Sequence, residues 1–297
     1  MSHLVAYFGN EPDNMSCALF SARNALTSTN HGPEGWALGF IQGGDVLLQK
    51  RPRAEAAEID LYGLVRELKA DAMIGRVGLG PEGNKAAENA DPFRYRSWLF
   101  GSVGSVPAFE LIRDKVLDAI PDFLRRNVRG RSPSEHLFHL FLAYLHDAGI
   151  LDLPSPDPAQ VEAALQGALS FTSRLIQNAV DDAVDDQDKN QDQRHGRGHG
   201  MELALVATNG RSLVATVRSH AMQMLRIDGI ADCPVCHGRA NPNGDGRRIS
   251  HEGLRAVIIE ANAQTQGRPG WRPIAENTAL IVGPDRIPHI TTLSTVT

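Results

Sequence analysis

The chain begins Met1-Ser-His-Leu-Val-Ala-Tyr-Phe-Gly-Asn10, and its architecture can be argued outward from this stretch. Leu4 to Phe8 is apolar and rich in aromatic residues, and a Gly-Asn turn pair follows, which predicts a buried β-strand that starts almost at the first residue. Chain ends fray unless they are tied down, so a core strand here places residue 2 beside the centre of the fold. Ser2 is small, which predicts removal of Met1 and a free α-amine next to a hydroxyl. An amine that titrates near pH 8 can serve as the base for its own side chain, although an edge strand with an ordinary serine is the simpler interpretation.

Composition narrows the class of protein. The 297 residues are 42% hydrophobic and 22% charged, which is ordinary for a soluble globular protein. The net charge of -5 argues against a nucleic-acid-binding surface, and no apolar run approaches the ~20 residues of a membrane span. The N-terminus has no basic segment followed by a hydrophobic one, so we expect a cytoplasmic protein with no nucleic-acid and no membrane partner. Homo-oligomers are common, but no hydrophobic stripe here specifies such an interface.

The order of predicted elements indicates a single domain over residues 1–297. Strand-like runs flank two turn signals, Gly43-Gly44 and Asn209-Gly210, and each pair of runs predicts a hairpin. Strands come first, then helices, then strands again. This order favours an α+β sandwich.

Two predicted helices and two irregular segments stand out in the middle and the later part of the chain. Ser132-Pro-Ser-Glu135 predicts a helix start with a capping box, and a second long helix is predicted over 159–180. Residues 181–200 are acidic and then rich in Arg, His and Gly, which predicts a mobile polar loop, and 231–250 form a Cys/Gly/Asn-rich insertion. The first helix carries histidines that we expect on a solvated face: His136, His139 and His146.

With these blocks in order, the sequence resembles the class II glutamine amidotransferases, which belong to the N-terminal nucleophile hydrolase superfamily. The resemblance covers most of residues 1–150 and, more weakly, the C-terminal strands. Its blocks are SHLVAYFGN from residue 2, HGPEGWALGF from 31, IGRVG from 74, ENADPF from 88, WLFGSVGSVPAF from 98, RSPSEHLF from 131 and TNGRSLVATVRS from 208. The resemblance implies a four-layer αββα sandwich with the nucleophile at the end of the first strand. It also implies hydrolysis of the glutamine side-chain amide through a thioester on an N-terminal cysteine, with release of ammonia and no required cofactor.

The catalytic positions that the resemblance implies depart from the family pattern. The nucleophile position holds Ser2, which is a poorer nucleophile at neutral pH than a partly ionised thiol. The Asn-Gly pair of the oxyanion pocket is Val103-Gly104 here, so Gly104 remains as a candidate donor while the valine side chain cannot donate a hydrogen bond. Losing one such donor typically costs about 3–4 kcal/mol of transition-state stabilisation.

The substrate-binding positions are also mixed. Arg76 stands where the family has the arginine that grips the substrate carboxylate, and a structural ion pair is an equal alternative. The aspartate that binds the substrate amine falls at Pro133, which can neither accept that bond nor carry charge. Asp91 replaces a family histidine, and it could bind the Ser2 amine.

Three functional hypotheses follow. The first is an amidotransferase-like protein that has lost glutaminase activity and acts as a binding or scaffold partner. The second is an amide hydrolase with Ser2 as nucleophile, acting on a γ-glutamyl or acyl amide. The first therefore predicts a protein partner, and the second predicts a small-molecule amide substrate. In the third, the likeness to the amidotransferase site is incidental, and a C-terminal zinc module mediates protein association.

Cys233-Pro-Val-Cys236-His237 is a separate chemical signal. A C-x-x-C turn can present two thiolates to one Zn²⁺, and His237 or another residue could help to complete a tetrahedron. The candidate partners are His220, His251 and the loop that holds His195 and His199. Free thiols, a redox disulfide and a c-type haem attachment are the alternatives, the last of which needs export. Cys17 is expected to be a small buried residue.

Overall fold

The N-terminal strand lies at the centre of a seven-stranded antiparallel sheet in the computed structural model. The structure describes residues 3–28, 35–51, 59–79, 87–187, 200–236, 251–261 and 267–293, with the backbone alone for 28, 59, 79 and 183–187. The strand order in this sheet is β13 (Trp271–Pro273), β11 (Met222–Ile230), β12 (His251–Ala261), β1 (His3–Gly9), β6 (Ala72–Leu79), β3 (Gly35–Gln42) and β4 (Asp45–Arg51). The predicted N-terminal strand and the hairpin at Gly43-Gly44 are confirmed, whereas β11 is a strand that the sequence pattern did not predict.

A second, six-stranded antiparallel sheet faces the first. Its order is β15 (Pro288–Thr292), β14 (Thr278–Val282), β10 (Leu213–Arg218), β9 (Glu202–Thr208), β8 (Trp98–Ser105) and β7 (Phe93–Tyr95). The hairpin predicted at Asn209-Gly210 joins β9 to β10. The Asn209 side-chain oxygen accepts from the backbone N–H groups of Arg211 and Ser212, at 3.0 and 2.9 Å, which fixes the turn. A small sheet pairs β2 (Thr27–Ser28) with β5 (Ile59–Asp60).

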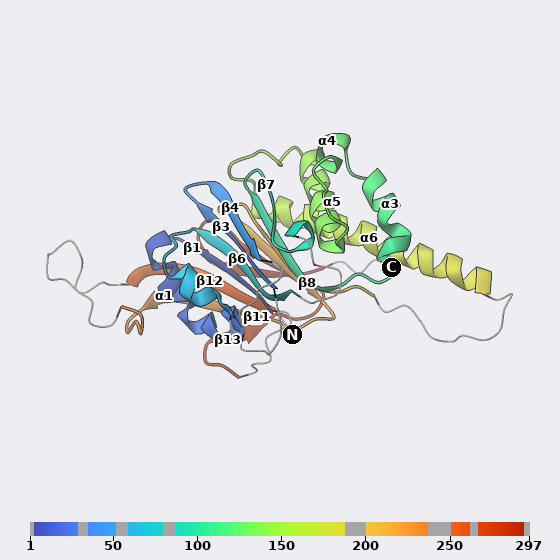
Figure 1. The fold of residues 1–297 in the computed structure, drawn as a ribbon. Coiled ribbons are helices and arrows are strands. Elements are labelled where there is room, and N and C mark those ends of the chain that lie inside the picture. Colours follow the sequence, from blue (N-terminus) through green and yellow to red (C-terminus); the bar gives the residue numbers. More distant parts are fainter. Residues whose placement is uncertain are drawn as a thin grey trace.

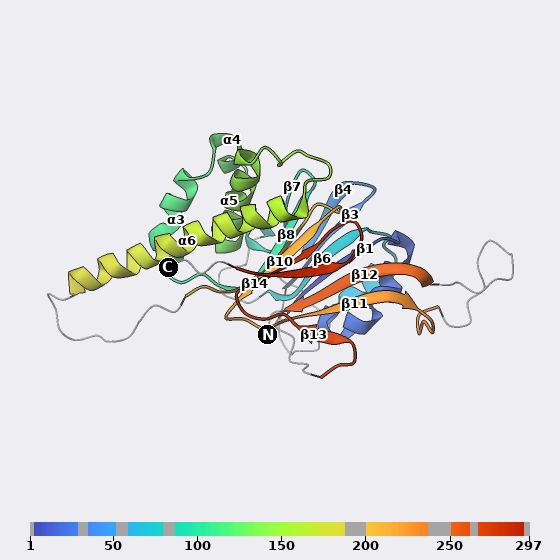
Figure 2. The ribbon, with the colours of Figure 1, turned by 180° about the vertical axis from the view of Figure 1, so that it is seen from behind.

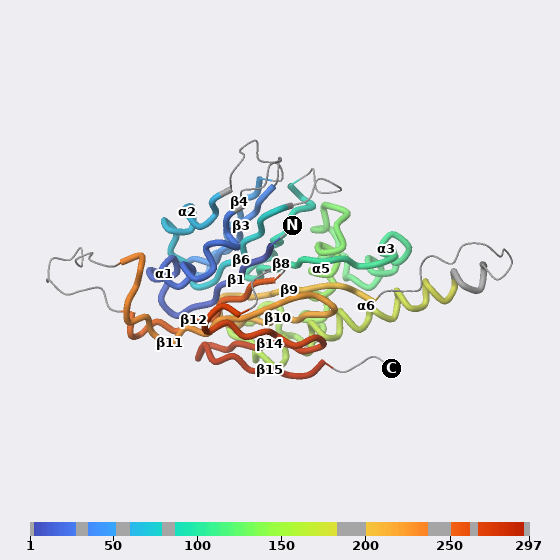
Figure 3. Tube along the Cα trace, turned by 90° about the horizontal axis from the view of Figure 1, so that it is seen from below, coloured from blue at the N-terminus to red at the C-terminus, as the bar shows by residue number. Residues whose placement is uncertain are grey.

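Helices cover both outer faces of the sheet pair. They are α1 (Met15–Leu19), α2 (Leu61–Val65), α3 (Phe109–Asp118), α4 (Asp122–Arg125), α5 (Pro133–Asp147) and α6 (Pro158–Gln187), with 3-10 helices η1 (Pro12–Asn14), η2 (Phe20–Leu26) and η3 (Ala87–Asn89). Figures 1 and 3 show α1 and α2 on the opposite side of the sheets from α5 and α6. Within the described part of the chain, no helix has the length and apolar character needed to cross a bilayer.

Three layers of apolar side chains separate four layers of secondary structure. Alternate residues of β1 face opposite ways, as strand geometry requires. Leu4, Ala6 and Phe8 enter the core between the two sheets. Val5 and Tyr7 pack with α1, η2 and α2 on the outer face. The third layer lies between the six-stranded sheet and α3, α5 and α6. Figure 2 shows the ribbons of these helices from behind. The αββα sandwich expected from the resemblance is therefore the observed architecture.

The start of α5 differs in one detail from the predicted capping box. The Ser132 hydroxyl accepts from the backbone N–H of Glu135 at 3.2 Å, as predicted. The Glu135 carboxylate does not complete the reciprocal bond; instead it accepts from the backbone N–H groups of Arg129 and Gly130, at 2.9 and 2.6 Å. The glutamate therefore fixes the loop that precedes the helix.

Helix α6 is longer than predicted. It continues to Gln187, well into the segment 181–200 that the sequence predicted to be a loop. A side-chain hydrogen bond of 2.8 Å from Gln177 to Asp181, one helical turn later, shows that the acidic residues at this point take part in the helix. Residues 188–199, the rest of the predicted loop, lie outside the described residues.

We predict that Gly104→Ala destabilises the protein more than Gly44→Ala does. Both glycines have positive φ, +123° and +91°, so both substitutions carry a backbone cost of about 1 kcal/mol or more. A Cβ on Gly104 would also clash with the Glu202 carbonyl oxygen and lie 2.9 Å from the Glu202 carbonyl carbon and the Leu203 Cα, whereas one on Gly44 would meet open space. Overpacking of this kind adds about 1–3 kcal/mol. Equal losses of unfolding free energy for the two variants in urea titrations would contradict this packing.

Candidate functional site

An ion pair joins the two sheets near the beginning of β1. Arg76 lies on β6 opposite Leu4, and its side chain lies on the same face of β6 as Ile74, toward the second sheet. Its Nη1 donates to Asp91 Oδ2 at 2.6 Å and to the Ser102 carbonyl oxygen at 2.6 Å. The two side chains are only 12% and 2% exposed. A guanidinium so far removed from water requires a partner of this kind.

The Asp91 carboxylate extends this pair into a network. Its Oδ2 also accepts from the Ser102 backbone N–H at 2.9 Å and from the Ser102 hydroxyl at 3.2 Å. The Ser102 hydroxyl lies 2.5 Å from the Ser134 hydroxyl in the first turn of α5. One carboxylate thus links β6, β8 and α5. We call Arg76, Asp91, Ser102 and Ser134 the bridging network.

The residues at the oxyanion position have structural roles. Val103 alternates with Ser102 on β8, so its side chain faces the core between the sheets and is 4% exposed. Gly104 follows with the positive φ that its close approach to β9 requires. Of Val103 and Gly104, it is therefore Gly104 whose backbone conformation requires a glycine. Its role as an oxyanion donor stays a prediction.

The described residues begin one position after the predicted nucleophile. Ser2 lies outside them, and His3 pairs with Val77, next to Arg76. Pro133 is the first residue of α5, where its missing N–H has no cost, because the first helical N–H groups have no partner within the helix. The substrate-binding roles of Arg76 and Asp91 stay predictions, but the structure brings these two residues together.

His220 lies within electrostatic range of Arg76, although the sequence suggested this histidine only as a metal ligand. Burial lowers the pKa of its imidazole, Glu202 raises it and Arg76 lowers it, so both charged groups act on the ring electrostatically. Its Nε2 is buried and has no hydrogen-bond partner among the described residues. No local motif could have indicated this effect, because His220 follows the end of β10 and Arg76 lies on β6.

Two histidines of α5 are buried, which corrects the expectation of a solvated face. His136 is 2% and His139 is 3% exposed. The Nδ1 atom of each ring lies 2.9 Å from the carbonyl oxygen one turn earlier, that of Ser132 and that of Glu135. Burial lowers the pKa of His139 to about 4, with the Glu135 carbonyl opposing the shift. The i, i+3 spacing placed these histidines on one side of the helix, but it could not say what covers them; Phe109 of α3 packs against the His136 ring at 5.1 Å between ring centroids.

A polar cavity of about 610 Å³ lies beside the loop that holds Asp91. It is lined by Leu48, Lys50, Glu88, Phe93, Arg94, Tyr95, Arg96, Asn127, Arg129, Glu135 and His139. Lys50 donates to the carbonyl oxygens of Ala87 and Ala90, at 3.4 and 2.7 Å, and burial lowers its pKa against the opposing charges of Asp91, Glu135 and Glu88. No sequence motif indicated this cavity, because its lining comes from several separate elements.

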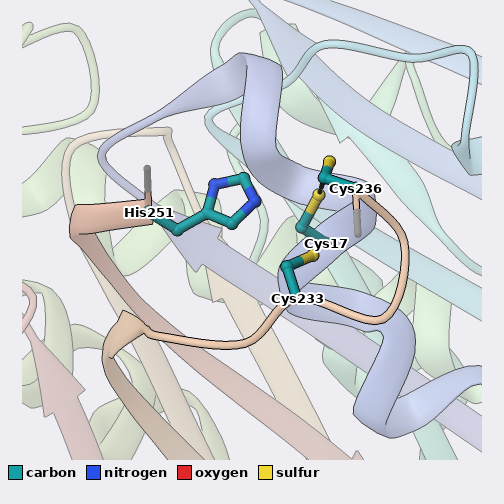
Figure 4. A group of neighbouring side chains, drawn as sticks. All are labelled: Cys17, Cys233, Cys236 and His251. Carbon is teal, nitrogen blue, oxygen red and sulfur yellow. Dashed lines mark hydrogen bonds between the residues drawn. The ribbon is translucent and has the colours of Figure 1, made fainter. Parts of the chain in front are cut away.

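A second group of reactive side chains lies at another part of the fold. Cys17, Cys233, Cys236 and His251 converge so that their ligand atoms all lie within 4.8 Å of one another (Figure 4). Burial raises the pKa of the Cys17 thiol, and the neighbouring thiols of Cys236 and Cys233 raise it further. This Cys₃His cluster could hold a metal ion. His237, the ligand suggested by adjacency, lies outside the described residues, and Cys17 was predicted only to be buried.

We predict strong coupling between Arg76 and Asp91. Arg76→Met or Asp91→Asn alone leaves a buried partner without its counter-charge, which typically costs about 3–5 kcal/mol of unfolding free energy. The double variant should lose less than the sum, with a coupling of at least about 1 kcal/mol. Lys69 and Asp13 form the control pair, because their atoms are also 2.6 Å apart but their side chains are 68% and 71% exposed. Their cycle should give little coupling. Additive losses at Arg76 and Asp91 would contradict a shared network.

We predict that His139 makes the protein less stable in acid. Its pKa is about 4 in the folded chain against 6.5 for an ordinary histidine. As the pH falls through this window, the unfolded chain therefore takes up a proton that the folded chain does not. The unfolding free energy should drop as the pH falls from 6.5 to about 4, by up to about 3 kcal/mol from this group. His139→Asn should flatten the curve of urea unfolding free energy against pH. A variant curve parallel to that of the natural protein would rule out this contribution.

Several solved structures share this architecture. The glutamine aminotransferase class-II domain protein from Silicibacter pomeroyi superposes with a TM-score of 0.58 at 15% identity, covering 99% of this chain and 100% of that one. The predicted glutamine amidotransferase from Pseudomonas aeruginosa gives 0.51 at 14% identity, covering 96% and 94%. The glutamine phosphoribosylpyrophosphate amidotransferase from B. subtilis gives 0.53 at 13% identity, covering 98% of this chain but 49% of that one, so this chain spans about half of that enzyme.

By sequence, no protein-family model and no curated protein matches the chain. The likeness to the solved structures is therefore one of fold, carried by the two facing sheets and their outer helices. This chain has the fold of the class II glutamine amidotransferase domain.

Proposed function

We propose that this chain does not hydrolyse glutamine and acts instead as a binding or scaffold partner built on the amidotransferase fold. The observation that carries the proposal is the internal use of Arg76. Its Nη1 is shared between Asp91 and the Ser102 carbonyl, each at 2.6 Å. A glutamine carboxylate would have to compete for this guanidinium with a buried carboxylate that is part of the fold.

The second support is the lack of a side-chain donor at the oxyanion position. Val103 packs in the core between the sheets, so no rotation of its side chain could supply a hydrogen bond. Hydrolysis of an amide builds negative charge on the carbonyl oxygen, and the missing donor would leave that charge less stabilised by about 3–4 kcal/mol.

The third support is the start of α5. Pro133 stands where the resemblance expects the carboxylate that holds the substrate amine, and the Ser132 hydroxyl is occupied as the helix cap. The helix start is thus intact while the group that would bind the amine is absent from this position. The cavity beside the Asp91 loop is a place on this fold where a small ligand could bind without hydrolysis.

The alternative is an amide hydrolase that uses Ser2 as nucleophile. Gly104 favours it, because this glycine and its positive φ occur where the resemblance places the remaining oxyanion donor. This alternative needs a free α-amine on Ser2, and therefore removal of Met1.

We predict no turnover that depends on Ser2. The natural protein and Ser2→Ala would be incubated with L-glutamine and a panel of γ-glutamyl and acyl amides, with release of ammonia and of the acid product measured. Equal background rates are expected, because the groups that bind glutamine and stabilise its tetrahedral intermediate are substituted or used internally. An amide that raises the melting temperature should do so in both proteins.

Intact-mass measurement of the N-terminus makes this test decisive. Turnover by a Met1-processed protein that is abolished in Ser2→Ala would overturn the proposal and establish the hydrolase. A protein that is processed and inactive on the whole panel supports the binding role. A protein that retains Met1 also excludes the hydrolase, because the α-amine of Ser2 would be blocked.

A further inference from the structure

All the cysteines of this chain meet at one place. The sequence contains 3 cysteines, and Cys17, Cys233 and Cys236 are those three. Cys17 comes from α1 and the other two from the turn after β11, and Cys17 and Cys236 are 219 residues apart in sequence. His251, the first residue of β12, joins them. Convergence of all three cysteines on one histidine across such a separation is the arrangement expected of residues that share a ligand.

The spacing of the four ligand atoms suits a tetrahedral metal ion. With Zn–S and Zn–N bonds of about 2.3 and 2.1 Å, the edges of a tetrahedron are about 3.5–3.8 Å long. The ligand atoms lie within 4.8 Å of one another, and the Cys17 and Cys236 sulfurs are 3.3 Å apart. That separation is well beyond the ~2.05 Å of a disulfide bond and close to the edge of a tetrahedron.

His251 supplies an independent indication of a ligand. Its side chain is 1% exposed, and neither ring nitrogen has a hydrogen-bond partner among the described residues. Leaving such a buried polar group unpaired costs about 1–3 kcal/mol. In Figure 4 the ring points toward the three sulfurs, so a metal ion among them would give one ring nitrogen the partner that it lacks.

We propose that Cys17, Cys233, Cys236 and His251 bind one Zn²⁺ in a closed structural site. Three thiolates and one imidazole at tetrahedral spacing are a donor set typical of zinc. Each cysteine binds as a thiolate and releases its proton to solvent. With four protein ligands the ion has no open position for a substrate, so the site is structural.

The proposed zinc ion would cross-link α1 to the β11–β12 hairpin. It lies beyond the Gly9 end of β1, because Gly9 pairs with Ala256 and His251 precedes that residue on β12. Arg76 pairs near the other end of β1, a strand of 7 residues that spans about 20 Å. The site therefore holds the outer layer of the sandwich in place and does not touch the bridging network, so it stands apart from the proposed function.

Metal analysis of the full-length protein tests this inference. Protein purified under reducing conditions without chelator should contain about one zinc per chain by elemental mass spectrometry. After removal of zinc, Co²⁺ should give the absorption of a tetrahedral thiolate site. Chelation should lower the melting temperature, and Zn²⁺ should restore it. No zinc in the purified protein, together with no uptake of Zn²⁺ or Co²⁺ after reduction, would overturn the proposal.

Variants identify the ligands. Cys17→Ser and His251→Asn should each lower the affinity for zinc at least about tenfold, measured in competition with a chromophoric chelator, because each removes one of four ligands. His220→Asn and His237→Asn are the matched controls and should bind zinc as the natural protein does. Loss of zinc in His237→Asn with retention in His251→Asn would refute the ligand set.

Thiol reactivity gives a readout on the natural protein that does not depend on how a variant folds. With zinc bound, the three thiols should react slowly with a disulfide reagent, and chelation should speed all three by at least about tenfold, because bound thiolates are shielded. Equal rates with and without chelator would count against the site. So would a Cys17–Cys236 disulfide in a protein that, once reduced, does not bind zinc.

Discussion

A guanidinium between two facing sheets is tolerated only with a buried counter-charge. This requirement determines how the residues of the bridging network are arranged. Asp91 supplies the charge, and the same carboxylate oxygen accepts the backbone N–H and the hydroxyl of Ser102. Because Ser102 lies on β8 and also contacts Ser134 at the start of α5, the pair connects both sheets and a helix. Removing either member would leave the other's buried charge unpaired, and removing Asp91 would also leave the Ser102 backbone N–H without its acceptor. Arg76 is therefore part of the folded scaffold, and a ligand could bind its guanidinium only by displacing these contacts.

The fold of this chain therefore resembles that of an amidotransferase domain, while the residues at the catalytic positions have structural roles. The facing sheets and outer helices match those of class II amidotransferase domains, and a shared fold does not by itself establish a shared reaction. Val103 and Pro133 are each well suited to their structural positions, one in an apolar core and one in the first turn of a helix. The cysteine and histidine cluster lies beyond the opposite end of β1, and stability at that end can depend on metal without affecting the bridging network.

Local sequence patterns predicted much of the fold. The apolar run at Leu4 to Phe8 gave the central strand, and two glycine-containing turns gave their hairpins. What the patterns missed depends on tertiary contact. The partnership of Cys17 with Cys236 joins segments 219 residues apart, and burial of His139 depends on which elements pack around α5. The order of motif blocks placed Arg76 and Asp91 in the same site, but no pattern could show that they neutralise each other. Helix α6 passes its predicted end, and Asp181, just beyond that end, accepts a hydrogen bond from Gln177 one turn earlier.

The most direct measurement of the central claim is nitrogen-15 NMR of the arginine guanidinium groups, with the Arg76 signal assigned by its loss in Arg76→Lys. If Asp91 and the Ser102 carbonyl hold Arg76, its Nη protons exchange slowly with water, and the signal does not move when L-glutamine is added to saturation. A slowly exchanging signal that collapses in Asp91→Asn would agree with this account. A fast-exchanging Arg76 whose signal shifts on addition of L-glutamine would contradict it, because the guanidinium would then be free to grip the carboxylate of a substrate.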